Sequence, residues 1–356
     1  MSVLAVRWRR SLAAGVALAA AATLAACGSG SDSGGGAADS TPAQAATLTI
    51  YSGRSESLVG GLLDQLKAAV GVPVEVRYGS TGEMSAQILE EGSASPADVF
   101  FGQDAGALGA LSKAGMLAPL PAEVTAPVDA RYKAADNTWV ATSARARVVA
   151  YNTDKVPADQ LPANVDALLD PKWKGKIGYA PSNASWLSFV TGLRLLRGED
   201  GARQWLTAFA AQDPQRFEGN GNILDALAQG TIDLGLVNHY YLYEKTRDKD
   251  PATYPVRNHY VPNDPLGLIN VAGVGVVKST DAPEAAQKAV AFLLSPQAQQ
   301  YLVDRTAEYP TVAGVTPSRK EPPLPDLSTL NGPAVDLAAL DSLPQTEQLL
   351  QEVGLL

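Results

Sequence analysis

The fold is decided by residues 48–78, which read LTIYSGRSESLVGGLLDQLKAAVGVPVEVRY. The run Leu48–Tyr51 is strand-like, and Val74–Tyr78 alternates apolar and polar side chains as a half-buried strand does. Between them, Leu58–Val70 carries apolar residues at helical spacing and ends at Gly71. A strand, a helix and a second strand in so short a segment predict a βαβ unit with parallel strands.

The same alternation recurs along the chain. Further strands are expected at Asp98–Phe101, Lys176–Tyr179, Leu234–Val237 and Val271–Val277. Two such runs in 356 residues predict an α/β protein of two lobes, each a mainly parallel sheet flanked by helices, with a ligand cleft between them. We expect residues 47–144 and 271–318 to form lobe 1. Residues 145–270 and 319–356 are expected to form lobe 2.

The composition excludes several classes of protein. The chain has a formal net charge of −9, one cysteine and two histidines, His239 and His259. An acidic chain is a poor nucleic-acid binder, and a single cysteine excludes an internal disulfide and thiolate-rich metal sites. The sequence also lacks the nucleophile-elbow, dinucleotide-binding, P-loop, zinc-protease and EF-hand motifs. We therefore predict a binding protein and not an enzyme.

The first 46 residues are expected to export and tether the chain. Residues 1–26 combine arginines, the short apolar run Ser11–Thr23 and a small-residue motif, as a signal peptide does. The motif Leu-Ala-Ala-Cys27 resembles the bacterial lipobox, in which lipid is attached to the cysteine; the alternative is an ordinary signal peptide with a free cysteine. Residues 27–46 are rich in Gly, Ser and Ala and predict a flexible tether. We expect a monomer, lipid-anchored on the extracytoplasmic face of the cell membrane.

Polar loops after the predicted strands supply candidate binding residues. Arg54 lies in the first strand-to-helix loop, where it either binds an anion or is a solvated arginine beside a helix cap. Arg145 and Arg147 share one face of a predicted strand and could hold an anion together. Gln103 and Asp104 follow another strand, and Asp104 has the position of a helix N-cap.

The segment Asn238-His239-Tyr240-Tyr241 is the strongest candidate for a metal site. The tyrosines follow the strand Leu234–Val237, at the edge of the sheet where α/β proteins bind ligands. A bound cation can deprotonate a phenol, although the ordinary pKa of the phenol is about 10. Aromatic packing on a helix is the competing interpretation, and the residues alone leave both open.

Six segments together carry a family resemblance. They are Tyr51–Arg54, Glu90–Phe100, Ala144–Asn152, Pro171–Gly178, Asn238–Tyr241 and Ala307–Pro310. On these segments the chain resembles the periplasmic ferric-iron-binding proteins, the FbpA-like substrate-binding components of ABC importers, over nearly all of residues 48–356. The resemblance implies a periplasmic-binding-protein-like fold, with an ABC permease and its ATPase as partners.

The resemblance also implies a ligand set. Two adjacent tyrosines ligate Fe(III) in that family, which matches Tyr240 and Tyr241, and Tyr51 and Gln103 are candidates for assisting ligands. Carbonate or phosphate is expected as a synergistic anion. The implied anion contacts are Arg54, Arg145, Ser182, Asn183, Asn220 and Asn238. Two positions depart from the pattern, since Ser55 stands where some members have a histidine ligand and Gln103 where some have a glutamate.

Three functions follow from this pattern. The first is a lipoprotein that captures Fe(III) by lobe closure and delivers it to an ABC importer. The alternative is a protein that binds a phosphorylated or other anionic small molecule without metal. An extracytoplasmic hydrolase is the third, and the missing nucleophile elbow argues against it.

Overall fold

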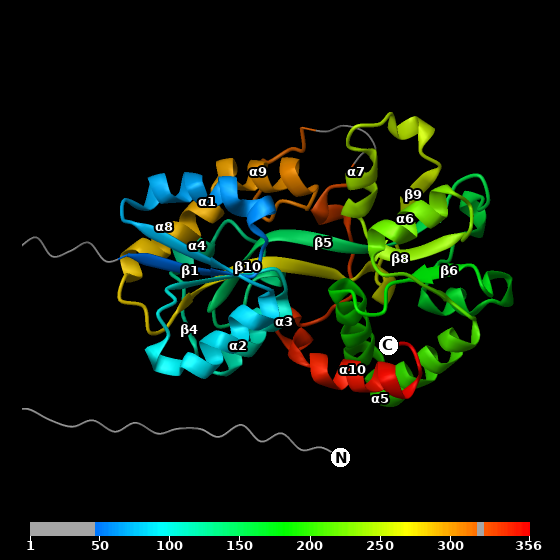
Figure 1. Cartoon of the computed structure of the whole chain (residues 1–356), viewed down its shortest axis with the longest axis horizontal. Helices are drawn as coiled ribbons and strands as arrows, with labels where there is room; N and C mark the ends of the chain where they lie inside the picture. Colours follow the sequence, from blue (N-terminus) through cyan, green and yellow to red (C-terminus); the bar gives the residue numbers. More distant parts are fainter. Residues whose placement is uncertain (1–46, 319–323) are drawn as a thin grey trace, which may run out of the picture. The chain divides into compact units, whose positions relative to one another are not determined.

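The computed structural model describes residues 47–318 and 324–356. The predicted signal peptide, Cys27 and the tether lie outside these residues, so the expectations for them stay predictions. No helix in the described ranges is both long and apolar enough to cross a membrane. The described body is built on one mixed sheet with helices on both faces (Figure 1).

The strand order of the sheet is β2-β1-β3-β10-β5-β8-β6-β7, with β4 beside β10 and β9 beside β5. The strands are β1 (Leu48–Ser52), β2 (Val74–Tyr78), β3 (Val99–Gly102), β4 (Leu117–Ala118), β5 (Trp139–Asn152), β6 (Ile177–Tyr179), β7 (Gln215–Arg216), β8 (Leu234–Asn238), β9 (Val256–His259) and β10 (Ile269–Val277). We call β1–β4 and their helices the β1 half, and β6–β9 with theirs the β6 half.

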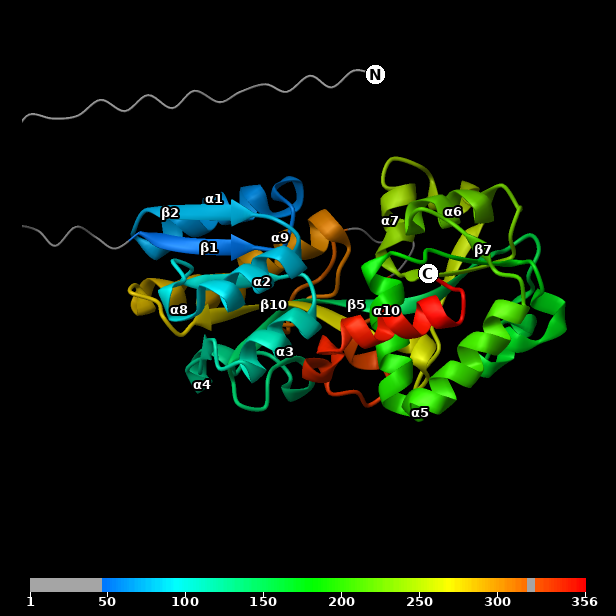
Figure 2. The same cartoon turned by 60° about the horizontal axis from the view of Figure 1, so that its bottom comes forward.

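The two halves are joined through two long central strands. The pairs β1–β2, β1–β3, β6–β7 and β6–β8 are parallel, as predicted. In contrast, β5 and β10 are antiparallel to each other, β10 is antiparallel to β3, and β5 to β8. The first part of β5 pairs with β10 and its second part with β8, so this strand runs from one half into the other (Figure 2).

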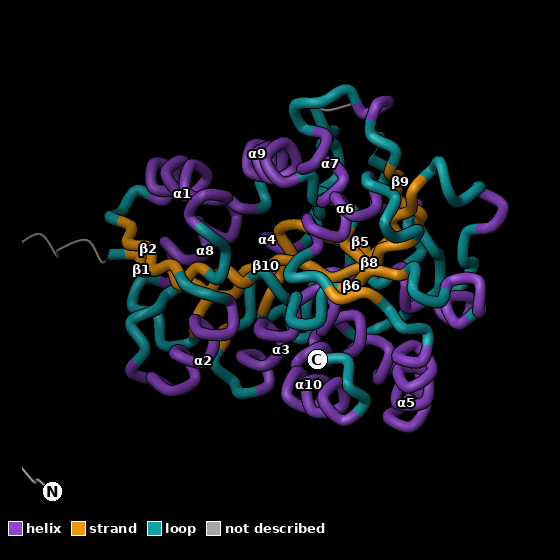
Figure 3. Tube along the Cα trace, turned by 45° about the vertical axis from the view of Figure 1, so that its right-hand side comes forward, coloured by secondary structure: helices purple, strands orange, loops and turns teal. Residues whose placement is uncertain are grey.

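Helices cover both faces of the sheet (Figure 3). They are α1 (Glu56–Val70), α2 (Thr81–Glu91), α3 (Ala105–Lys113), α4 (Ala122–Thr125), α5 (Ala184–Ala211), α6 (Asn220–Ala228), α7 (Tyr240–Thr246), α8 (Pro283–Leu293), α9 (Pro296–Thr306) and α10 (Leu343–Glu352). In Figure 3, α1 and α9 lie above the sheet and α2 and α3 below it, while α6 and α7 lie above the other end and α5 and α10 below.

Local sequence signals account for the helix ends nearest the first loops. Helix α1 ends at Gly71, which has a left-handed φ of 77° that glycine adopts without steric cost. Ser80 and Glu83 form a capping box at the start of α2. Helix α5 is broken at Gly198, where φ is 73° and ψ is 169°, so it consists of two helical parts.

Separate hydrophobic cores lie in the two halves. One surrounds β1, β3 and β10 and includes Ile50, Leu62 and Val274. Another lies under α5 and contains packed aromatic rings, among them Trp205 and Phe209 stacked at 5.0 Å. The two lobes that the sequence predicts correspond to these separate cores.

The C-terminal segment contributes to both cores. Leu337 and Leu340 pack into the core of the β1 half, although the sequence assigns residues 319–356 to lobe 2, whereas Leu349 and Leu350 of α10 pack against α5. We therefore propose that the described segment after residue 323 is shared between the two lobes and does not belong to lobe 2 alone.

Candidate functional site

A cavity of about 360 Å³ opens where the loops after β1, β3 and β8 face the start of α5. Its lining residues include Gly53, Gln103, Arg145, Arg147, Asn183, Asn238, Tyr240 and Tyr241. Six of the ten residues that the sequence and the resemblance single out as metal or anion contacts are among them. Because polar loops at the carboxyl ends of neighbouring strands meet here, the cavity is the expected place for a ligand.

Tyr240 and Tyr241 lie side by side at the start of α7. Their ring centroids are 4.4 Å apart with an angle of 31° between the ring planes, and both rings are partly buried. Desolvation by burial, reinforced by the neighbouring Tyr241, raises the pKa of Tyr240 well above 10. The phenol of Tyr240 is therefore protonated at neutral pH in the metal-free protein. A cation that binds it must displace the proton.

Two arginines reach the cavity from one face of β5. Arg145 donates a hydrogen bond from Nη2 to the carbonyl oxygen of Gln103. Arg147 donates from Nη1 to Ser185 Oγ at 3.0 Å and from Nη2 to the Leu236 carbonyl at 2.8 Å. Burial lowers the pKa of Arg147 to about 9, so the side chain keeps its charge at neutral pH. In the described part of the chain, the buried Nε atoms of both arginines have no hydrogen-bond partner.

The start of α5 forms a second polar wall. Asn183 caps this helix, because its Oδ1 accepts from the Ser185 amide at 3.0 Å. The same oxygen accepts from Asn220 Nδ2 at 3.2 Å, so buried Asn220 supports the wall from behind without lining the cavity. Ser182 is exposed and lies outside the lining.

Two predicted residues of the β1 loop are not brought into the cavity. The Tyr51 hydroxyl donates to Glu91 Oε1 at 3.1 Å and accepts from Arg77 Nη1 at 2.8 Å. Arg54 is fully buried and donates from Nη1 and Nη2 to the two carboxylate oxygens of Glu308, at 2.9 and 3.1 Å. Both side chains are thus engaged within the protein.

Gln103 and Asp104 lie at the rim between the two halves. Asp104 has the predicted N-cap role, because its Oδ1 accepts from the Gly106 amide at 2.7 Å. Its Oδ2 accepts from Ser188 Oγ at 3.1 Å and from Asn270 Nδ2 at 2.6 Å. Ser188 and Asn270 are not among the residues that the sequence predicts for the site. No local motif marks them, and they meet Asp104 only through the fold.

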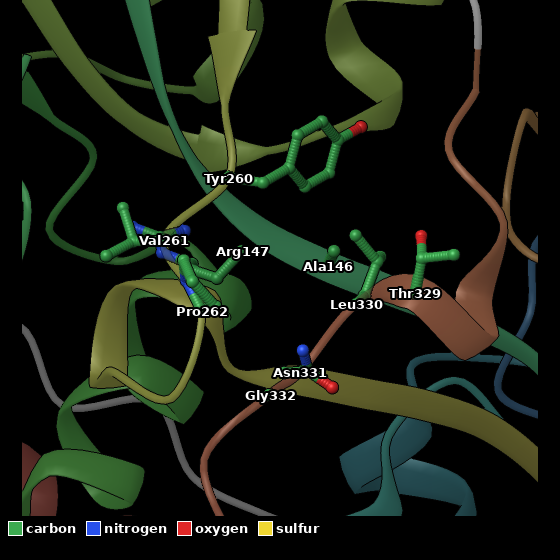
Figure 4. Close-up of a pocket in the computed structure, with 10 residues that line it drawn as sticks. Ala146, Arg147, Tyr260, Val261, Pro262, Thr329, Leu330, Asn331 and Gly332 are labelled. Atoms are coloured by element: carbon green, nitrogen blue, oxygen red, sulfur yellow. The ribbon is translucent and has the colours of Figure 1, made fainter.

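A second cavity, of about 190 Å³, lies beside β5 (Figure 4). Ala146, between the two arginines, lines it together with Tyr260, Leu330 and Asn331. Arg147 lines this cavity as well as the first one, and none of the other predicted metal or anion residues lines it.

Comparison with known proteins agrees with the fold. Residues 94–338 match the family model of bacterial extracellular solute-binding proteins. The chain belongs to this family. Over 318 residues, covering 88% of this chain and 95% of the relative, the solute-binding protein is 34% identical to the major ferric iron-binding protein of Neisseria meningitidis serogroup A. It is 32% identical to the Fe(3+)-binding periplasmic protein of Serratia marcescens, over 87% of this chain and 90% of that relative.

Solved structures extend the comparison. Iron-bound HitA from Pseudomonas aeruginosa superposes on the solute-binding protein with a TM-score of 0.77 at 33% identity, covering 86% of this chain and 99% of that one. IdiA (FutA) of Trichodesmium, in complex with iron and citrate, gives a TM-score of 0.76 at 28% identity, covering 87% and 99%. The predicted periplasmic-binding-protein-like fold is therefore confirmed.

Proposed function

We propose that this solute-binding protein captures ferric iron with a synergistic oxyanion and delivers it to an ABC importer. The observation that carries the proposal is the pair Tyr240–Tyr241, whose phenols share a cavity with Arg145 and Arg147. Phenolate is a hard oxygen ligand of the kind that trivalent iron prefers. The relatives named for ferric iron binding support the same ligand.

The charges of the cavity favour a bound anion beside the metal. Two phenolates leave one of the three charges of Fe(III) uncompensated, and Arg145 and Arg147 add two more positive charges nearby. Asp104, with its carboxylate hydrogen-bonded at the rim, offsets one of these. A small oxyanion such as carbonate or phosphate would supply the missing negative charge and accept hydrogen bonds from the guanidinium groups.

In the proposed site, Tyr240 and Tyr241 are the metal ligands and Gln103 is the nearest candidate for a further oxygen ligand. Arg145 is the principal anion contact, with Asn183 and Asn238 beside it. Asn220 supports Asn183 through a hydrogen bond, and Ser182 lies at the edge of the proposed site. Closure of the two halves on the ion, transfer to the permease, and lipid anchoring through Cys27 complete the proposal.

A ferric citrate titration of the iron-free protein tests the assignment. We expect a visible phenolate-to-iron charge-transfer band that saturates at one iron per chain. Gallium citrate added to the iron-free protein in the same way should bind without giving a visible band. A wild-type protein that gives neither the band nor tight iron binding contradicts the iron assignment.

The two buried arginines also favour a second candidate, a protein for anionic small molecules that binds without metal. Calorimetry with phosphate, citrate and sugar phosphates in chelator-treated buffer distinguishes the two. Under the iron proposal these anions bind weakly until iron is added. Tight metal-free binding of one of them would favour the second candidate.

A further inference from the structure

The residue before the tyrosine pair, His239, is fully buried and makes two side-chain hydrogen bonds. Its Nδ1 accepts from the backbone amide of Ala146 at 3.2 Å. Its Nε2 bonds to the carbonyl oxygen of Ala307 at 2.8 Å, which can only accept. The ring is therefore a neutral imidazole with its proton on Nε2, and both nitrogens are used.

These two bonds join His239 to strand β5 and to the segment of residues 307–309. The His239 amide also donates to the Ala146 carbonyl at 3.0 Å, so backbone and ring together hold one residue of β5. That residue lies between Arg145 and Arg147, the two cations of the cavity. The start of α7 is thus fixed to the strand that carries the proposed anion contacts.

The other bond reaches the segment that holds Arg54. Ala307 has a left-handed backbone with φ of 56°, an unfavourable conformation for a residue with a side chain. The next residue, Glu308, binds Arg54, and Tyr309 pairs with Ala144 of β5 and stacks on the His239 ring at 4.4 Å. The bond from His239 helps to hold this strained corner.

The imidazole also contacts the first tyrosine directly. The rings of His239 and Tyr240 meet edge to face, with centroids 5.7 Å apart and an interplanar angle of 86°. His239 occupies the N-cap position of α7 but makes no capping bond with its side chain. The direction of Tyr240 therefore depends on how the imidazole is held between β5 and the 307–309 segment.

We infer that His239 is the positioning residue of the tyrosine pair: held between Ala146 and Ala307, it sets the direction in which Tyr240 presents its phenol oxygen to the cavity. This inference rests on the proposed function, because it concerns the geometry of the phenolate ligands. It assigns His239 no contact with the metal. Its role is to orient a ligand through packing and two hydrogen bonds.

Two substitutions separate the contributions. His239→Phe keeps an aromatic ring for Tyr309 and Tyr240 but removes both hydrogen bonds. His239→Gln restores a donor within reach of the Ala307 carbonyl. The matched control is His259→Phe, because His259 also bonds a backbone carbonyl, that of Pro162 at 3.0 Å, and lines neither the cavity nor the tyrosine pair.

The measurements are the wavelength of the charge-transfer band, the iron affinity in competition with citrate, and the melting temperature of the iron-free protein. We expect H239F to shift the band and weaken iron binding by about 10- to 100-fold, the range for outer-shell changes at metal sites. H239Q should recover part of both. H259F should leave the band and the affinity unchanged.

Three outcomes would overturn the inference. If H239F melts earlier but keeps the wild-type band and affinity, His239 has only a structural role. If H239F does not fold, H239Q decides, and a wild-type band and affinity in that variant overturn the inference. If wild-type protein gives no band at all, the proposed function fails and this inference fails with it. If wild type gives the band and the His239 variants have the same band and affinity as wild type, only the inference is overturned.

Discussion

The loops after β1 and β8 carry the same kinds of residue and use them differently. Each leads from a strand into a helix and has tyrosine and polar residues at or beside it. In the β8 loop, Tyr240 and Tyr241 line the cavity. Tyr51 near the end of β1 is hydrogen-bonded to Glu91 and Arg77, and Arg54 in the loop that follows is hydrogen-bonded to Glu308, so neither side chain lines the cavity.

The difference arises from partners far away in sequence. Arg54 and Glu308 are separated by 254 positions, and the carboxylate is delivered by the segment that pairs with β5. A buried arginine with a matched carboxylate has its charge satisfied and has little reason to bind a second anion. The β1 loop therefore stabilises the fold of its own half, while the residues after β8 remain available for binding.

The sharpest test of this contrast exchanges phenols for phenyl rings in both loops. The double change Tyr240→Phe with Tyr241→Phe should abolish the charge-transfer band. It should also weaken iron binding more than about 10,000-fold, since each lost ligand costs more than the roughly 100-fold of an outer-shell change. Tyr51→Phe, measured by the same ferric citrate titration, should leave band and affinity near wild type. Loss of the band in the Tyr51 variant alone would reverse the contrast.

Removing the partner of Arg54 tests the structural role of the β1 loop. Glu308→Gln leaves a buried guanidinium without its counter-charge, and we expect a loss of about 3 kcal/mol in the free energy of unfolding. Urea unfolding of the iron-free protein measures it. Glu352→Gln is the matched control, because Glu352 pairs with Arg203 on the surface and such pairs contribute less than about 1 kcal/mol. Equal effects in the two variants would rule out the special role of the buried pair.

The same pair predicts a pH dependence of stability. Burial alone would raise the pKa of Glu308, but the charges of Arg54 and Arg145 and the hydrogen bonds from Arg54 and Ser143 lower it overall from 4.5. A depressed folded-state pKa stabilises the protein above the unfolded value, and this stabilisation is lost as the pH falls through the folded-state pKa. Below pH 5, the free energy of unfolding should therefore fall less steeply with decreasing pH in Glu308→Gln than in wild type. The same dependence of the free energy of unfolding on pH in both proteins would contradict the prediction.

The contrast between local and distant partners also explains which parts of the fold and the site could be predicted from the sequence. Local patterns suffice for the βαβ unit of residues 48–78, the N-cap at Asp104 and the position of Tyr240–Tyr241 after a strand, because each depends on neighbours in sequence. The engagement of Arg54 could not be predicted, since Glu308 has no local feature that points to it. The same applies to Asn270, which meets Asp104 only after β3 and β10 pair.

Local sequence patterns also could not predict that the central strands β5 and β10 are antiparallel. The sequence favours mainly parallel lobes, and the outer strands are parallel. However, no local feature of the 14 residues of β5 fixes whether the strand runs parallel or antiparallel to its neighbours. Their direction is set by which strands they join, and this topological fact places Arg145 and Arg147 at the cavity.

If the β1 arginine is structural, an arginine of β5 should bind the anion. Arg145→Gln removes a charged donor that lines the cavity, and we expect iron binding in bicarbonate buffer to weaken about tenfold, the size of one charge-assisted hydrogen bond. The control is Arg131→Gln, whose exposed side chain pairs with Asp129 away from the cavity. An Arg145 variant with wild-type affinity and bicarbonate dependence would place the anion elsewhere.

The smallest expected effect concerns the rim, where the two halves touch beside the cavity. Ser188 of α5 donates to Asp104 at 3.1 Å across that boundary, so Ser188→Ala removes one hydrogen bond that favours the closed arrangement. A net hydrogen bond contributes about 0.5–1.5 kcal/mol, and we expect iron affinity to fall about threefold through faster release, measured by stopped-flow transfer to a chelator. Ser112→Ala is the control, because its bond to Asp136, at 3.2 Å, lies within the β1 half. Equal release rates in the two variants would show that the Asp104–Ser188 contact does not contribute to closure. The β3 loop would then resemble the β1 loop, in which polar side chains stabilise the fold and do not take part in binding.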